Sequence, residues 1–122
     1  MQIQIHTDSN IDGRDALADQ IKGVVEHALS RFSDRITRVE VHLNDESSHK
    51  SGPKDIRCMM EARLEGRPPG AVTHHAATVE QSVGGAAHKL TRLIEGTLGR
   101  LRDKSHHKTD TDLAEPERAD AS

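Results

Sequence analysis

The chain has 122 residues, which is enough for one domain with a single modest core. One Phe and no Trp or Tyr exclude a platform of aromatic rings for single-stranded nucleic acid, and a lone cysteine, Cys58, excludes a disulfide framework and a zinc site built on several cysteines. The net charge is −3, and no apolar run has the length of a membrane span. The first ten residues lack the pattern of a signal peptide, so we expect a cytoplasmic protein with no membrane partner.

The charge changes sign near the end of the chain. Residues 88–108 carry six basic and two acidic residues, whereas residues 109–122 carry one basic and five acidic residues. A basic segment can meet phosphate groups even when the whole protein is acidic.

The first half of the chain predicts a strand, a helix and a second strand. Residues 1–7 alternate apolar and polar residues, which indicates a strand. Residues 15–34 carry an apolar stripe at helical spacing, and residues 36–44 alternate again with three apolar residues on the inner face. The helical stripe consists of Leu17, Ile21, Val24, Val25, Ala28, Leu29 and Phe32.

The second half predicts two more strands and a second helix. Residues 54–64 place every second residue, Cys58 among them, on a buried face, and residues 65–70 form a turn. Residues 71–79 form a weaker strand, and residues 80–104 form a helix. Gly84 and Gly85 lower the helix propensity of that segment, so packing must hold it or another backbone must approach closely there.

The order strand, helix, strand, strand, strand, helix predicts an α+β fold. We expect a β-α-β-β-β-α two-layer sandwich, with a four-stranded sheet and both helices on one face of it. The first two strands should be parallel, because a helix connects them, and the short later connections favour antiparallel neighbours. The domain should occupy residues 1–104, and residues 105–122 should form a disordered acidic tail.

Nothing in the sequence points to catalysis or to a cofactor. There is no phosphate-binding glycine loop, nucleophile elbow or metalloprotease helix, and Cys58 falls on the inner face of a strand. Nine histidines raise the question of a metal, but His74 and His75 point to opposite faces of a strand. We therefore expect a protein that is not an enzyme and has no catalytic residue, metal or cofactor.

Basic residues on the two predicted helices are candidates for contacts with a phosphate backbone. On the second helix they leave the apolar stripe and reach solvent, and on the first helix they lie on the exposed side. Exposed helices also carry such residues for solubility alone. The candidates are Lys22, Arg31, Lys89, Arg92, Arg100, Arg102 and Lys104.

Several short motifs, in order, carry a family resemblance. The chain opens on MQIQIHT, a helix ends in HALSRFSDRI and runs directly into the strand TRVEVHLN, and the last helix has the basic end GRLRDK. Over residues 1–104 the chain resembles the ribosome hibernation-promoting factors, also called ribosome-associated translation inhibitors or sigma-54 modulation proteins, of the short type.

The resemblance implies a fold similar to a double-stranded-RNA-binding domain. It also implies a non-enzymatic role in ribosome hibernation, a stress response in which the protein occupies the small ribosomal subunit and silences idle ribosomes. The protein would contact phosphates of ribosomal RNA and would recognise the shape of the RNA rather than its base sequence. Arg100, Arg102 and Lys104 fall where members of the family carry alternating basic residues, and Gly84 stands where they carry a Tyr.

Two other classes of function stay open at this point. A divergent member of the family would act as a protein–protein interaction module, through an outer sheet face that carries Arg57, Met59, Glu61 and Arg63 or through a sheet edge. A histidine-based metal or small-molecule domain is the third possibility. The sequence favours a monomer, whereas a stable homodimer would favour the protein–protein interaction module.

Overall fold

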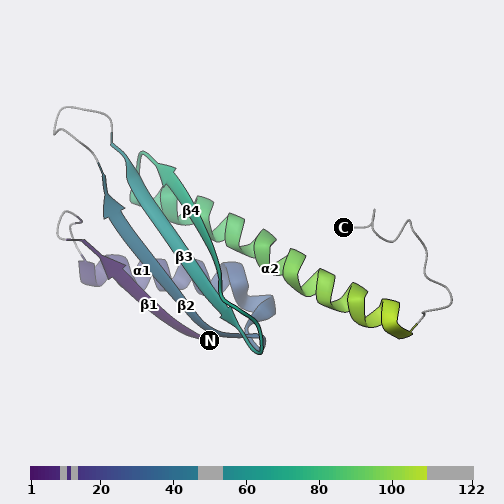
Figure 1. Ribbon diagram of the computed structural model, residues 1–122. Helices are drawn as coiled ribbons and strands as arrows, with labels where there is room; N and C mark the ends of the chain where they lie inside the picture. Colours follow the sequence, from purple (N-terminus) through teal and green to yellow (C-terminus); the bar gives the residue numbers. More distant parts are fainter. Residues whose placement is uncertain (9–10, 12–13, 47–53, 110–122) are drawn as a thin grey trace. The chain divides into compact units, whose positions relative to one another are not determined.

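The computed structural model describes residues 1–8, 11, 14–46 and 54–109, and the order of its elements confirms the predicted β-α-β-β-β-α fold (Figure 1). The chain divides into two compact units, residues 1–91 and residues 92–122. The first unit holds the whole sheet, helix α1 and the start of helix α2.

The sheet has four strands in the order β1-β2-β3-β4, so β1 and β4 are its edges. β1 pairs with β2 in parallel, and the other two pairings are antiparallel, as expected from the connections. A register shift between Ile36 and Arg38 bends the start of β2, where Thr37 donates a hydrogen bond of 3.2 Å to the carbonyl of Arg63. The strands are β1 (Gln2–Thr7), β2 (Ile36–Asp45), β3 (Ile56–Leu64) and β4 (Gly70–Ala76).

One face of the sheet is buried and the other is open. Alternate residues of β2 and β3 are buried, as the period-2 pattern predicts, and α1 and the first part of α2 lie on that face (Figure 1). The core of the first unit is therefore a single layer between sheet and helices. It includes Ile21, Val25, Leu29, Val39, Val41, Leu43, Cys58, Met60, Val83, Ala87 and Leu90.

The first helix is shorter than predicted. α1 covers Arg14–Leu29, and a 3-10 helix, η1, covers Ser30–Phe32. Two hydrogen bonds between backbone groups three residues apart, from Ser33 to Ser30 and from Arg35 to Phe32, tighten the chain before β2 starts. The apolar stripe continues through this turn, so periodicity alone did not mark the end of the α-helix.

Val24 departs from the predicted stripe. Its side chain is 40% exposed, whereas the adjacent Val25 is fully buried. Consecutive helical residues point about 100° apart, so a stripe that includes both was too wide for the core.

The second helix starts at a cap and ends later than predicted. α2 covers Val79–Thr109, and the Thr78 hydroxyl accepts a hydrogen bond of 3.0 Å from the backbone N–H of Gln81, as an N-cap does. The helix thus continues beyond residue 104, and the segment up to Thr109 is helical rather than part of a tail. Residues 110–122 of the predicted tail lie outside the described residues.

Candidate nucleic-acid interface

The first unit carries three of the seven candidate residues. Lys22 lies exposed on α1, and Arg31 lies exposed in η1. The Arg31 guanidinium stands over the ring of Phe32, 4.7 Å from its centroid, which is a cation–π geometry.

Lys89, the third of these residues, has a role in the fold as well as an exposed charge. Its Nζ donates a hydrogen bond of 2.9 Å to the backbone carbonyl of Thr73 on β4. β4 is an edge strand, and a lysine beside an edge strand hinders the addition of a further strand there. Lys89 is exposed, as expected, but the sequence did not show this bond.

The second unit carries the other four candidates, all on α2. Arg92 and Arg100 are exposed, and Arg100 Nη2 lies 3.5 Å from the hydroxyl of Thr97 one turn earlier. Arg102 and Lys104 fall within the same helix, but their side chains lie outside the described residues. One continuous helical segment therefore supplies the basic run at the end of the domain.

The paired glycines of α2 have different surroundings. A Cβ at Gly85 would overlap the imidazole of His74 on β4, so Gly85 lets that strand side chain approach the helix. The sequence had suggested either that packing holds the helix or that another backbone approaches the glycines, and at Gly85 a side chain takes the space. At Gly84 a Cβ would meet nothing within 4 Å.

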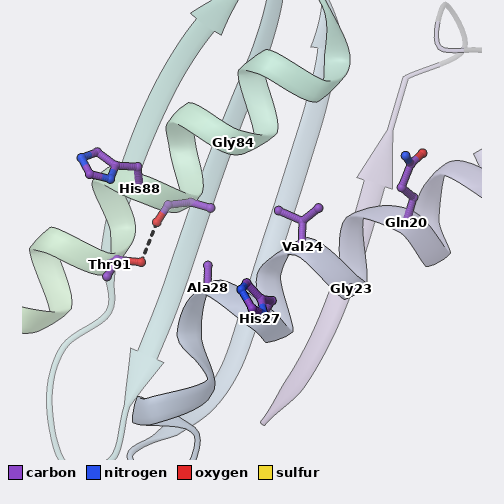
Figure 2. Close-up of a pocket in the computed structure, with 9 residues that line it drawn as sticks. Gln20, Gly23, Val24, His27, Ala28, Gly84, His88 and Thr91 are labelled. Carbon is purple, nitrogen blue, oxygen red and sulfur yellow. Dashed lines mark hydrogen bonds between the residues drawn. The ribbon is translucent and has the colours of Figure 1, made fainter.

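Gly84 instead lines an open hollow of about 610 Å³ between α1 and α2 (Figure 2). Val24, Ala28 and His27 border the hollow from α1, and His88 and Thr91 border it from α2. The hollow is largely apolar, and no lysine or arginine among the described residues lines it.

Cys58 is buried on the inner face of β3, as predicted. Burial raises the pKa of its thiol from 9.0 to about 12, and the nearby Arg57 charge offsets only part of that effect. A thiol in this state is a poor nucleophile, since the thiolate is the reactive form.

On the outer face of the sheet, the structure brings together side chains that the sequence reasoning left apart. Glu40 Oε1 lies 3.5 Å from Nε2 of both His6 and His42, and Arg38 Nη2 lies 2.9 Å from the other Glu40 oxygen. Alternation placed all of these residues on the outer side of their strands. Only the pairing register of β1 with β2, which aligns His6 with His42, could have shown that they meet.

A second group of potential ligands lies where β2 ends, β3 begins and β4 ends. His75 Nε2 is 3.4 Å from a carboxylate oxygen of Glu46, and Asp55 lies within reach of both. His74 contacts the helix side instead, so the two neighbouring histidines of β4 do point to opposite faces, as expected from the strand geometry.

Comparison with known proteins decides the family. The sequence model of one family, described as sigma 54 modulation protein / S30EA ribosomal protein, matches residues 3–102. The chain belongs to this family. The S30EA family comprises ribosome-associated factors and is not a known class of enzyme. This is the family that the motifs of the sequence resemble.

Solved structures show the same fold. The N-terminal domain of Protein Y from Thermus thermophilus superposes with a TM-score of 0.64 at 17% identity, covering 80% of this chain and 99% of that domain. A ribosomal subunit interface protein from Coxiella burnetii gives a TM-score of 0.60 at 18% identity, covering 81% of this chain and 99% of its own. At these identities the two structures support the S30EA fold alone.

A search of curated proteins found no match to the chain. Within the described part of the chain, no helix is both long enough and apolar enough to cross a bilayer.

Proposed function

We propose that this S30EA-family protein binds the small ribosomal subunit in the cytoplasm and silences idle ribosomes by contacting ribosomal RNA. The contacts are made by basic residues of the helices, with Arg92, Arg100, Arg102 and Lys104 of α2 as the main group. Lys22, Arg31 and Lys89 of the first unit add to them.

The family match over residues 3–102 carries this proposal. It covers β1 from Ile3, the other three strands and α2 up to Arg102. The likeness therefore includes Arg92, Arg100 and Arg102 of the basic run, whereas Lys104 lies beyond it. The exposure of Lys22, Arg92 and Arg100 is consistent with it, because a charge must face solvent to reach a phosphate.

The physics of such an interface is that of charge and shape. Basic side chains on a helix neutralise phosphates and release counterions, which gives affinity without sequence preference. The single ring of Phe32 lies beneath Arg31, so the described residues offer no aromatic platform for unstacked bases. A structured RNA surface is therefore the target that these residues fit.

Co-sedimentation with purified small subunits at low salt tests the proposal. The wild-type protein should pellet with the subunits, and the triple variant Arg100→Gln, Arg102→Gln, Lys104→Gln should remain largely in the supernatant. Glutamine is unbranched and polar and has a helix propensity close to that of arginine and lysine, but it carries no charge, so a loss of binding reports mainly on the charge.

A matched triple variant controls for the change in net charge. Lys54, Arg63 and Arg67 are exposed and lie away from α2 in the chain, in β3 and the segments beside it. Their replacement by Gln removes the same three charges and should leave binding close to wild type. Equal loss in both variants would reject the assignment to α2, and no binding by the wild type at any salt would reject the proposed function.

A further inference from the structure

The outer face of the sheet holds two imidazoles and a carboxylate on neighbouring strands. Glu40 and His42 are two residues apart on β2, so both point to the same face, and His6 of β1 is the register partner of His42. The two rings stack with centroids 4.5 Å apart and planes 13° apart. Parallel pairing of β1 and β2 thus sets both rings side by side.

The potential ligand atoms of these three residues lie close together. Nε2 of His6 and Nε2 of His42 each lie 3.5 Å from the same oxygen, Oε1 of Glu40, and all three atoms lie within 4.8 Å of one another. Good N–H···O hydrogen bonds are shorter, roughly 2.7–3.2 Å. The distance leaves room for a cation beside Oε1 of Glu40. Because a metal ion binds in the plane of an imidazole ring, the stacked rings of His6 and His42 must turn about their Cβ–Cγ bonds to share it.

The spacing fits a tetrahedral metal. Bonds of about 2.0–2.1 Å to nitrogen and oxygen put neighbouring ligands of a tetrahedral zinc ion roughly 3.4 Å apart. We propose that His6, Glu40 and His42 bind one transition-metal dication, with zinc as the ion that the ligand set and spacing fit best.

Neighbouring side chains hold the carboxylate in position. Arg38 Nη2 lies 2.9 Å from Oε2 of Glu40 and donates a hydrogen bond of 2.7 Å to Oε1 of Gln4. Arg38 thereby occupies one carboxylate oxygen and leaves the other directed at the imidazoles. Hydrogen bonds of this kind from outside the ligand set fix the orientation of metal ligands.

The site is accessible and leaves one coordination position open. The side chains of His6, Glu40 and His42 are 48%, 21% and 35% exposed, so an ion reaches them from solvent and keeps a position for water. Three protein ligands with one open position is a common arrangement for zinc. Because the ligands come from β1 and β2, the bound ion ties an edge strand to its neighbour.

The two imidazole ligands favour one class of metal ion over others. Zinc, nickel and copper accept imidazole readily, whereas magnesium prefers oxygen ligands. The group of Glu46, Asp55 and His75 offers only one imidazole beside two carboxylates, so it is a weaker site for the same ions. Zinc should therefore bind first at His6 and His42.

Titration of the full chain with Zn²⁺, followed by calorimetry and by thermal unfolding, tests the site. The double variant His6→Gln, His42→Gln should lose one equivalent of bound zinc, or bind it about 100-fold or more weakly. The wild-type Tm should rise with zinc, since an ion that binds only the folded state stabilises it. The double variant should lose most of that rise, and Mg²⁺ should not shift the wild-type Tm.

A second double variant, His27→Gln with His88→Gln, removes the same number of histidines from exposed helix positions. It should bind zinc like the wild type, and so should His75→Gln. Histidine-ring NMR signals give a readout without mutation: those of His6 and His42 should shift at the first equivalent. Equal binding by wild type and the His6/His42 variant, or first shifts at other histidines, would overturn the proposal.

The metal site does not depend on ribosome binding. Zinc titration uses the isolated protein, and co-sedimentation with small subunits uses the basic residues of α2, so either proposal can fail while the other stands.

Discussion

Gly85 on α2 lies so close to the imidazole of His74 on β4 that a Cβ at residue 85 would overlap the ring. The neighbouring Gly84 has open space at the same position. A side chain is therefore sterically excluded at residue 85 and accommodated at residue 84, although both residues lie in the same helix.

Gly85→Ala should destabilise the protein and Gly84→Ala should stabilise it. Overpacking costs about 1–3 kcal/mol, which exceeds the gain of up to about 1 kcal/mol in helix propensity at residue 85. At residue 84 only the gain applies. Urea unfolding of both variants measures the difference, and equal effects of the two substitutions would contradict the close contact with His74.

Val25→Ala and Val24→Ala form a second matched pair on α1. Val25 is fully buried, so loss of two methyl groups should cost about 2 kcal/mol, including the space left behind. Val24 is 40% exposed beside the hollow, and its truncation should cost much less. Thermal unfolding of the two variants checks this, and a larger loss at Val24 would mean that the helix is rotated differently.

These two pairs show what the sequence could and could not predict. Period-2 alternation identified the buried residues of β3, and Val39, Val41 and Leu43 of β2, because a strand has only two faces. It missed the buried Ile36, which precedes the register shift in β2. A helix has a continuous circumference, so the stripe of α1 included Val24, and only packing decides which edge of the stripe is covered. The contact of Gly85 with His74 depends on where β4 lies against α2, which no local pattern contains.

The two candidate sites also differ in how well the sequence alone could predict them. The basic residues of α2 were recognisable because they break an apolar stripe and lie where the family carries such residues. The cluster of His6, Glu40 and His42 depends on a parallel register between strands far apart in sequence, and shifting that register by one residue would separate the rings. Likewise, the bond from Lys89 to Thr73 joins a helix to a strand edge.

Cys58 should resist thiol reagents in the folded protein and react on unfolding. Its thiol is buried and its pKa is raised to about 12, so almost no thiolate exists at neutral pH. Reaction with an aromatic disulfide reagent at increasing urea should follow the unfolding curve. Rapid reaction in the absence of urea would show that the inner face of β3 opens readily.

The same pKa predicts a loss of stability at high pH. The unfolded thiol loses its proton above about pH 9 and the folded one only near pH 12, so the unfolded state binds fewer protons in between. The free energy of unfolding should then fall with rising pH by about 1.4 kcal/mol per unit in that range from this group. Cys58→Ala should remove this component, and an unchanged slope in the variant would contradict it.

The variants Lys89→Gln and Lys22→Gln should differ in stability, because Lys89 contributes to the fold and Lys22 does not. Both remove one exposed charge, but only Lys89 donates a hydrogen bond to the Thr73 carbonyl. Lys89→Gln should therefore lower the free energy of unfolding by about 0.5–1 kcal/mol, whereas Lys22→Gln should leave it nearly unchanged. Chemical denaturation measures the stability of both variants, and equal stability would contradict a structural role of Lys89.

The salt dependence of small-subunit binding tests the central claim most directly. The dissociation constant of the wild-type protein should rise steeply as salt rises, because neutralising phosphates releases counterions. The triple variant Arg100→Gln, Arg102→Gln, Lys104→Gln should show a log–log slope smaller by about 2–3, roughly one for each phosphate that is no longer neutralised. A wild-type affinity that does not change with salt, or an unchanged slope in the triple variant, would contradict an RNA interface built on α2.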